Sequence, residues 1–297
     1  MATMTGKTVL ITGGTSGIGR ETAIGLAKLD AHIIVTGRNQ ARGEAGVSDI
    51  RARSNNDKVD LLLGDFTKFD DIRALAKQVR ETYRQLDVLV NNVGWLAQEK
   101  WTTVDGFEST FAVNHLAQLL ITYELLPLLK DSAPSRIINV TGGQVGDGSI
   151  DFDDLQAEKG FISLNHYSHA KRVMMATSYE LAQRLEGTGV TLNVVYPGAA
   201  NTNMTQNVQP DMMPWFLRLI FPLFKLMMRN QKPENAAVSS ILLASEARYE
   251  GQSGNYYDTK GKLAKFPPAM IDNDVTNRLY EMSMEMIGLS EPTPIHD

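Results

Sequence analysis

Short apolar runs rich in β-branched residues alternate with longer helical patterns over the first two-thirds of the chain. Six such runs predict strands, at residues 8–12, 32–36, 59–63, 88–91, 136–140 and 191–195. The amphipathic stretches between them predict helices, at residues 20–29, 70–84, 107–129 and 167–185. Apolar strands separated by helices indicate a parallel sheet covered on both faces, and right-handed crossovers then give a doubly wound α/β sheet.

The last third of the chain has a different composition. Residues 203–230 are rich in Met, Phe, Leu and Pro and predict an inserted, partly helical segment. Later patterns predict a helix over residues 236–244, a last strand over 254–258 and a closing helix over 275–287. Because no long polar linker interrupts the chain, we expect residues 1–297 to form one domain with a late insertion.

Composition narrows the classes of function. The chain has 297 residues and no cysteine, so disulfides, thiolate nucleophiles and cysteine-ligated metals are excluded. A formal net charge of −5 disfavours nucleic acid or an anionic membrane as the main partner, since both attract basic surfaces. We find no signal-peptide pattern and no apolar run that reaches the length of a transmembrane helix, so we expect a cytoplasmic protein.

A strand, a glycine turn and a helix start follow one another within residues 9–19. Gly13 permits a tight turn, Gly17 lets the backbone approach a pyrophosphate, and Gly19 lets the helix pack close to the strand. The start of a helix also offers N–H groups to anionic oxygens. At the first strand of such a series, the pattern favours a dinucleotide-binding Rossmann site over an ordinary glycine turn. The residues expected to contact the cofactor there are Gly13, Thr15, Ser16, Gly17, Ile18 and Gly19.

The end of the second strand indicates which dinucleotide binds. An NAD site usually has a carboxylate here, which accepts a hydrogen bond from the ribose 2′-hydroxyl. This chain has Arg38 and Asn39 instead. A guanidinium binds a 2′-phosphate with two hydrogen bonds, whereas a carboxylate would repel it. NADP(H) is therefore favoured over NAD(H), with a solvated surface arginine as the alternative.

Two further strand ends complete the expected cofactor site, because ligands bind at the carboxyl ends of parallel strands. Asp65, followed by Phe66, can accept a hydrogen bond from the adenine amino group. After the fourth strand, small residues would let the backbone lie along the adenosine ribose, at Asn91, Val93 and Gly94.

Tyr167 and Lys171 are four residues apart at the start of a helical pattern, so their side chains share one face of the helix. A nearby ammonium favours the phenolate and would lower the tyrosine pKa from about 10 toward a range useful for proton transfer. Tyr167 could then act as an acid toward a carbonyl or as a base toward an alcohol. The position of this pair in a dinucleotide fold, more than its spacing, indicates an active site.

These motifs together resemble the short-chain dehydrogenase/reductase superfamily. The matching residues are Thr12-Gly13-x-x-x-Gly17-Ile18-Gly19, Asn91-Asn92-Val93-Gly94, Asn114, Tyr167-x-x-x-Lys171 and Pro197-Gly198. Within it the chain is most similar to the retinol-dehydrogenase-like branch, through residues 150–156, the apolar segment 203–230, Tyr256-Tyr257-Asp258 and residues 279–289.

The resemblance implies roles for individual residues. Asn114 would belong to a proton relay, its backbone carbonyl holding a water near Lys171. Asn91 and Gly94 would contact the cofactor ribose, and Thr202 the nicotinamide carboxamide. The backbone around Pro197 and Gly198 would close over the nicotinamide ring, and Tyr167 and Lys171 would also contact the cofactor.

One position departs from the family pattern. The family has a serine at the end of the fifth strand, where its hydroxyl polarises the substrate oxygen, and here Gly142 takes that place. Losing one such donor typically costs about a hundredfold or more in rate, roughly 3 kcal/mol. Thr141 could substitute only with a local shift, because neighbouring strand side chains point to opposite faces. Gln144, on the following loop, is the other candidate.

No metal site is expected. Asp151, Asp153 and Asp154 lack the glycine and the distal glutamate of a calcium loop, so a solvated loop is favoured. His166 and His169 flank the tyrosine without a cluster of carboxylates, which favours a surface or pocket-rim role.

The apolar segment 203–230 has three interpretations: core packing, a mobile lid, or a surface that touches a membrane. Its prolines, Pro214 and Pro222, and its place after the nicotinamide loop favour the lid. Peripheral membrane contact is not favoured. An apolar lid implies a bulky, poorly polar substrate, since binding pockets are lined to match their ligands.

The leading hypothesis is an NADP(H)-dependent oxidoreductase that interconverts a carbonyl and an alcohol on an apolar molecule such as a retinoid, steroid, polyketide or terpenoid. Because Gly142 stands in the serine position, a non-redox cyclisation or a C=C reduction is the first alternative. A redox-silent, cofactor-binding protein is the second. The sequence leaves the substrate, the direction of reaction and any homo-oligomer open.

Overall fold

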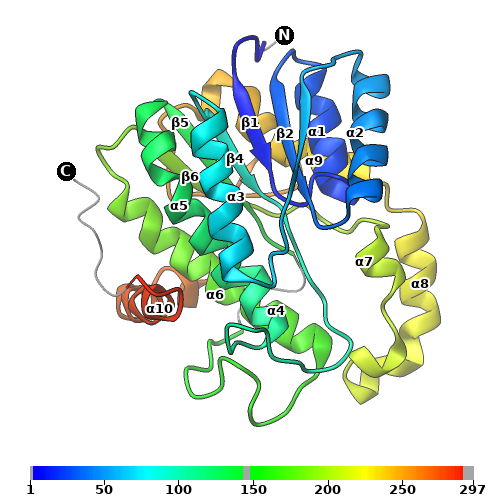
Figure 1. The fold of residues 1–297 in the computed structure, drawn as a ribbon. Coiled ribbons are helices and arrows are strands. Elements are labelled where there is room, and N and C mark those ends of the chain that lie inside the picture. The colour runs from blue at the N-terminus through cyan, green and yellow to red at the C-terminus, as the bar shows by residue number, and fades with distance from the viewer. Residues whose placement is uncertain (1–2, 143–147, 290–297) are drawn as a thin grey trace.

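The computed structural model describes residues 3–142 and 148–289, which build one eight-stranded sheet between two layers of helices (Figure 1). The strand order is β3-β2-β1-β4-β5-β6-β7-β8. The strands are β1 (Thr8–Ile11), β2 (His32–Gly37), β3 (Val59–Leu63), β4 (Val88–Asn91), β5 (Ser135–Val140), β6 (Val190–Val195), β7 (Tyr256–Tyr257) and β8 (Leu263–Ala264). All neighbours are parallel except β7 and β8. The predicted doubly wound fold is confirmed, and its order reverses between β1 and β4, where such sheets bind ligands.

Helices cover both faces of the sheet (Figure 1). One face carries α1 (Gly17–Ala27), α2 (Gln40–Ser54) and α9 (Pro233–Ser245). The other carries α3 (Phe69–Thr82), α4 (Ser109–Phe111), the π-helical turn η1 (Ala112–Leu116), α5 (Ala117–Asp131), α6 (Ser163–Arg184) and α10 (Asn273–Met286). Strand side chains alternate between the two resulting cores, since Val9 and Ile11 lie in one and Leu10 in the other.

Neither α2 nor β8 was predicted from the sequence, nor were the 3-10 turns η4 (Ala247–Tyr249) and η5 (Pro268–Met270). The helix α2 buries only Gly43, Gly46, Val47 and Ile50, so its apolar face is too short to give a helical pattern. The strand β8 has two residues and pairs antiparallel at the sheet edge. The predicted last strand is also shorter than expected, because only Tyr256 and Tyr257 pair with β6.

The apolar run Ser109–Asp131 corrects the expectation that no run reaches membrane-spanning length. It is the one helix among residues 3–142 and 148–289 that is long and apolar enough to cross a membrane by composition. However, 83% of its most apolar window is buried inside the fold, where α5 packs on α3 and η1 packs on α6. The run is therefore a core helix of the sheet's second layer.

The inserted segment forms α7 (Asn203–Gln206), two short 3-10 turns η2 (Pro210–Met212) and η3 (Trp215–Ile220), and α8 (Phe221–Arg229). In Figure 1, α7 and α8 lie at one side of the molecule, away from the helices that cover the sheet. Val208, Met212 and Met213 are buried, but no residue of η3 or α8 is. Core packing is therefore the wrong interpretation for residues 215–229.

Candidate functional site

The turn between β1 and α1 has an open helix terminus. Gly13 and Gly17 adopt positive φ angles of 65° and 54°, which a residue with a side chain rarely does. Ser16 is the N-cap of α1, but its side chain makes no capping hydrogen bond, and the first turn contains no acidic residue. The first N–H groups of the helix are thus left to an anionic ligand. Ile18 lies half-buried in this first turn.

The loop that follows β4 approaches the same turn closely enough to require glycine. A Cβ added to Gly13 would lie 3.2 Å from Val93 Cγ2, and one added to Gly19 would collide with the Asn92 amide and the Gly13 carbonyl. Asn92 Nδ2 donates to the Thr12 carbonyl at 3.0 Å. The cradle is therefore shaped by packing, and its open terminus fits the pyrophosphate of a dinucleotide.

Arg38 follows β2 directly and is exposed at the expected edge of the site. Its guanidinium carbon lies 5.4 Å from the centroid of the Trp95 ring, and among the described residues it forms no ion pair. Asn39 caps α2 by accepting from Arg42 N at 3.0 Å, so its side chain is already engaged. Thr15 packs against Gly37 and Gly46. Sequence reasoning missed Trp95, whose position after Gly94 gave no motif.

Three predicted cofactor residues use their side chains in the fold. Asp65 Oδ1 accepts from the backbone N of Thr67 at 3.0 Å and from its hydroxyl at 2.8 Å. Phe66 is buried in the core. Asn91 Nδ2 donates to Thr122 Oγ1 at 2.9 Å and to Asn139 Oδ1 at 2.8 Å, which ties β4 to its neighbours. Because the side chains of Phe66 and Asn91 are engaged in the fold, only their backbone groups could contact a cofactor.

The loop after β6 lies against the glycine turn. Pro197 and Gly198 begin it, and Gly198 has a positive φ of 79°. Thr202 caps α7, with its backbone N donating to Thr205 Oγ1 at 2.9 Å. A Cβ added to Gly17 would lie 3.1 Å from Thr202 Cγ2, and one added to Gly94 would lie 3.9 Å from Met204 Sδ. The fold therefore brings Thr202 to the glycine turn.

Tyr167 faces the end of β5. A Cβ added to Gly142 would lie 2.6 Å from Tyr167 Oη, so position 142 borders the phenol and offers it no side-chain hydroxyl. Burial, and the charge of Tyr196, raise the pKa of Tyr167 well above its ordinary value. This direction is opposite to the sequence-based expectation, because burial of the phenol disfavours the charged phenolate.

Lys171 is buried and held by the sheet. Its side chain is 2% exposed, and Nζ donates to the Val140 carbonyl at 3.0 Å. Burial lowers the pKa of Lys171 to about 7. Near neutral pH this lysine is therefore only partly charged.

Thr141 and Gln144 are the two residues predicted to replace the missing serine hydroxyl, and the structure describes the first of them. Thr141 is 2% exposed, and its hydroxyl has no hydrogen-bond partner among the described residues. That hydroxyl is thus a buried polar group still free to bond. Gln144 lies outside the described residues.

Asn114 lies in the π-helical turn η1, and its side chain holds the loop after β4. Nδ2 donates to the Thr110 carbonyl at 2.8 Å and to the Trp95 carbonyl at 2.6 Å, and Oδ1 accepts from Trp95 N at 3.1 Å. The side chain of Asn114 therefore positions Trp95, the residue that Arg38 lies against.

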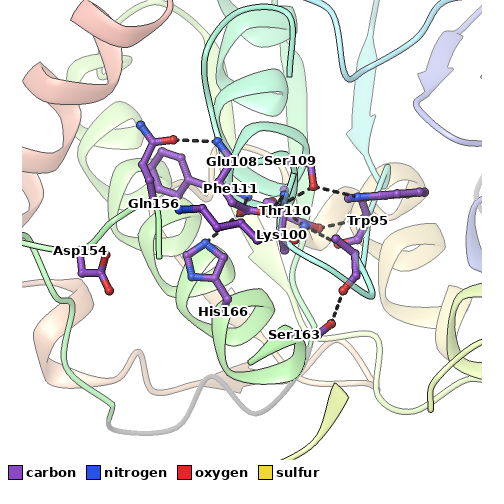
Figure 2. Close-up of polar contacts among 12 residues, drawn as sticks. Trp95, Lys100, Glu108, Ser109, Thr110, Phe111, Asp154, Gln156, Ser163 and His166 are labelled. Atoms are coloured by element: carbon purple, nitrogen blue, oxygen red, sulfur yellow. Dashed lines mark hydrogen bonds and ion pairs between the residues drawn. The ribbon is translucent and has the colours of Figure 1, made fainter. Parts of the chain in front are cut away.

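Glu108 and His166, the residue before Tyr167 in the chain, form a buried acid–base pair that sequence reasoning missed (Figure 2). Glu108 Oε2 lies 2.9 Å from His166 Nε2, and these side chains are 1% and 7% exposed. Glu108 also caps α4 by accepting from the backbone N of Thr110 and of Phe111, at 2.7 and 2.8 Å. Burial raises the pKa of Glu108, but the hydrogen bonds from His166 and the two amides outweigh it and hold the pKa below normal.

This pair corrects the predicted surface role of His166. It connects the first turn of α4 to the first turn of α6, the helix that carries Tyr167 and Lys171. The loop before α6 is joined to the pair as well, because the Gln156 side-chain carbonyl accepts a hydrogen bond from Glu108 N at 2.8 Å (Figure 2). A glutamate just before the Ser-Thr-Phe helix start was the available signal, because carboxylates cap helices.

His169 is also buried rather than at a surface. Its Nε2 accepts from the backbone N of Asp151 at 3.2 Å, and burial lowers the pKa of His169 to about 4. Asp151 Oδ1 in turn accepts from Asp153 N, and the Asp154 carboxylate accepts from Lys159 N. In the part of the chain that the structure describes, no group of three His, Asp or Glu side chains could hold a metal ion.

Comparison with known proteins bears on this arrangement. Residues 7–213 match the family model of the short chain dehydrogenases. The chain belongs to the short-chain dehydrogenase family. Members of this family are oxidoreductases that use a nicotinamide cofactor.

Individual relatives are similar over almost the whole chain. Retinol dehydrogenase 13 of Homo sapiens is 37% identical over 293 residues, which cover 98% of this chain and 88% of that protein. Retinol dehydrogenase 14 of Homo sapiens is also 37% identical, over 96% of this chain and 88% of its own length. The chain thus lies in the retinol-dehydrogenase-like branch.

A solved structure gives the same result for the fold. The RhlG/NADP active-site complex of Pseudomonas aeruginosa superimposes with a TM-score of 0.67 at 26% identity, covering 91% of this chain and 98% of that one. The predicted family and branch are therefore confirmed.

Proposed function

We propose that this short-chain dehydrogenase uses NADP(H) to interconvert a carbonyl and an alcohol on a bulky apolar small molecule. One observation carries the proposal. The Tyr167 phenol lies buried against the main chain at Gly142, at the carboxyl end of the sheet, with no side chain between the two. A substrate oxygen that reached this point would meet the phenol, a group that carries a proton.

The cofactor side supports NADP(H). The uncapped start of α1 would hold the pyrophosphate, and Arg38 would bind the 2′-phosphate at a strand end that carries no carboxylate. Thr202 would contact the carboxamide, since it already lies beside Gly17. When bound, the nicotinamide supplies or accepts the hydride at the substrate carbon. A similar fold is known in a complex with NADP.

Tyr167 would move the proton. Because burial raises its pKa, the phenol is protonated at neutral pH and acts as an acid toward a carbonyl oxygen. Oxidation of an alcohol needs the phenolate, which forms only at higher pH. We therefore propose that carbonyl reduction is the faster direction at neutral pH, with Lys171 and Asn114 supporting the site from behind.

The substrate class follows from the apolar segment and from the relatives' names. Segment 203–230 carries apolar side chains beside the loop that contacts the cofactor turn, so we propose that it covers a large apolar substrate as a lid. The named relatives are retinol dehydrogenases, which makes a retinoid the first compound to test. We also propose a cytoplasmic location, in solution or held peripherally on a membrane, which cell fractionation followed by a salt wash would test.

Loss of the reduced-nicotinamide absorbance, measured with a panel of retinoid, steroid and terpenoid carbonyls, tests the proposal. We expect turnover with NADPH, and a fall of about a thousandfold in kcat/KM for Tyr167→Phe, the size of a lost general acid. Tyr179→Phe is the matched control, because Tyr179 lies on the same helix but packs against Phe266. Absence of turnover with every carbonyl, or unchanged turnover in Tyr167→Phe, would refute it. Product formed without NADPH consumption would indicate a cyclase.

A further inference from the structure

An apolar surface covers the outer side of η3 and α8. Among the described residues fourteen large hydrophobic side chains are exposed, and seven of them fall within residues 215–227. These seven are Trp215 (78% exposed), Phe216 (58%), Leu219 (88%), Ile220 (50%), Leu223 (56%), Leu226 (60%) and Met227 (61%). Half of these fourteen side chains thus lie on η3 and α8, which is more than an ordinary solvent-exposed surface carries.

The surface is continuous along the helix. Leu219, Leu223 and Leu226 follow one another at spacings of four and three residues, which stacks their side chains on one face. Three further apolar residues of the helix, Phe221, Phe224 and Met228, are half-buried, and the rings of the two phenylalanines stack. α8 is therefore apolar both toward the protein and away from it.

Cations border this surface, and acids are absent from it. Between Asp211 and Glu234 the chain contains four basic residues and no acidic one, a local charge of +4 in a chain of net charge −5. The four are Arg218, Lys225, Arg229 and Lys232. Within the described residues none of the four forms an ion pair. The overall negative charge, which disfavoured a membrane at the sequence level, hides this local excess.

Two of the cations are held in place. Lys225 Nζ donates to the Gln206 carbonyl at 2.6 Å, and Arg218 Nε donates to the Met213 carbonyl at 3.2 Å. Both bonds join the exposed turns to the part of the segment that is anchored by buried Met212 and Met213. The apolar surface and its basic border therefore form one preorganised unit on the body of the protein.

We propose that η3 and α8 form a docking face for the surface of an anionic lipid bilayer. Leu219, Leu223 and Leu226 enter the outer acyl region, and Trp215 lies at headgroup level, where indole rings concentrate. The basic border meets the lipid phosphates, which adds affinity that salt screens. The proposal does not depend on the reaction that the protein catalyses.

Charge favours a bilayer over a second copy of this chain. A twofold interface through the same face would bring identical patches together, so that four cations of one copy face four of the other. Like charges in an apolar interface cost several kcal/mol. An anionic bilayer instead neutralises each cation as it buries the leucines.

Sedimentation with vesicles tests the proposal directly. The full-length protein is mixed with vesicles of phosphatidylcholine, with and without phosphatidylserine, at low and at high salt. We expect binding to the phosphatidylserine vesicles that weakens with salt. Leu219→Glu/Leu226→Glu should weaken it at least tenfold, and Arg229→Gln/Lys232→Gln by about fivefold for each cation removed.

The matched control is Val104→Glu/Leu263→Glu, which places the same charges on apolar side chains that are 80% and 69% exposed elsewhere. This variant should bind as the wild type does. Far-UV circular dichroism checks that all variants are folded. The proposal fails if the wild type does not bind phosphatidylserine vesicles, or if both glutamate variants lose binding equally. It also fails if light scattering finds a dimer that only Leu219→Glu/Leu226→Glu dissociates, because a second copy then covers the face.

Discussion

Glycine has opposite consequences at the two ends of the site. After β1, Gly13, Gly17 and Gly19 leave out side chains that would collide with neighbouring residues, which are Val93, Thr202 and Asn92. After β5, Gly142 removes a side chain at the point where a hydroxyl would contact the substrate. The first set is required by packing around the turn. Gly142, in contrast, leaves the Tyr167 phenol as the side chain that occupies the space beside residue 142.

The cofactor end and the chemical end of the site are supported by different parts of the fold. The cofactor end is formed by the glycine turn, Arg38 and Trp95 within the first 95 residues, together with the loop at Thr202. The chemical end depends on tertiary support, because Tyr167, Lys171 and His166 are held by β5 and by Glu108. Substitutions at the two ends should therefore affect cofactor affinity and turnover separately.

The largest effect is expected at Glu108, which supports the chemical end. Glu108→Ala removes the acceptor for two helix amides and leaves His166 buried without its partner, so it should lower the free energy of unfolding by about 3 kcal/mol. Urea denaturation measures the change. The exposed Glu81→Ala is the control and should stay within about 0.5 kcal/mol of wild type. Equal stability of both variants would show that the pair does not support α6.

Lys171 should make stability depend on pH. Its folded-state pKa, lowered to about 7, lies below the unfolded value, so between about pH 7 and 10 the unfolded chain binds more protons and stability rises with pH. Lys171→Met lacks this titration. Its stability advantage over wild type should therefore shrink by on the order of 3 kcal/mol from pH 7 to pH 10. A constant difference in denaturation experiments across this range would mean that the lysine stays charged.

Arg38 tests the cofactor end. Arg38→Gln should weaken NADP(H) binding roughly a hundredfold, because it removes a charge-assisted contact worth about 3 kcal/mol. NAD(H) affinity should not change, since NAD(H) carries no 2′-phosphate. Calorimetric titration with both cofactors measures this. Equal losses for the two cofactors would show that Arg38 acts through Trp95 and the shape of the site instead.

Substitutions of Gly142 should have the smallest effect on turnover. Two variants separate the effect of displacing the phenol from the effect of adding a hydroxyl. Gly142→Ser and Gly142→Ala both add a Cβ that would lie 2.6 Å from Tyr167 Oη, so both must displace the phenol. We expect kcat to fall about tenfold in each, the size of a modest misplacement at a reacting group. If serine raises kcat while alanine lowers it, a missing hydroxyl limits the enzyme and the phenol tolerates the shift.

Sequence patterns predicted what depends on local residues. The sheet and the glycine turn follow from apolar runs and from fixed spacings along the chain, and the position of Gly142 beside the tyrosine follows from the family resemblance. The Glu108–His166 pair and the Arg38–Trp95 contact join residues 57 to 58 positions apart, so no local pattern contains them. The pKa values of Tyr167 and Lys171 also depend on burial, which spacing does not reveal.

Titration of NADPH into wild-type and Tyr167→Phe protein, with turnover measured on the same samples, tests most directly whether the two ends are separate. We expect the two dissociation constants to agree within about threefold, because the phenol makes no contact that forms the glycine turn. Turnover should nevertheless fall about a thousandfold. A dissociation constant that weakens in parallel with turnover would contradict the separation of cofactor binding from proton transfer.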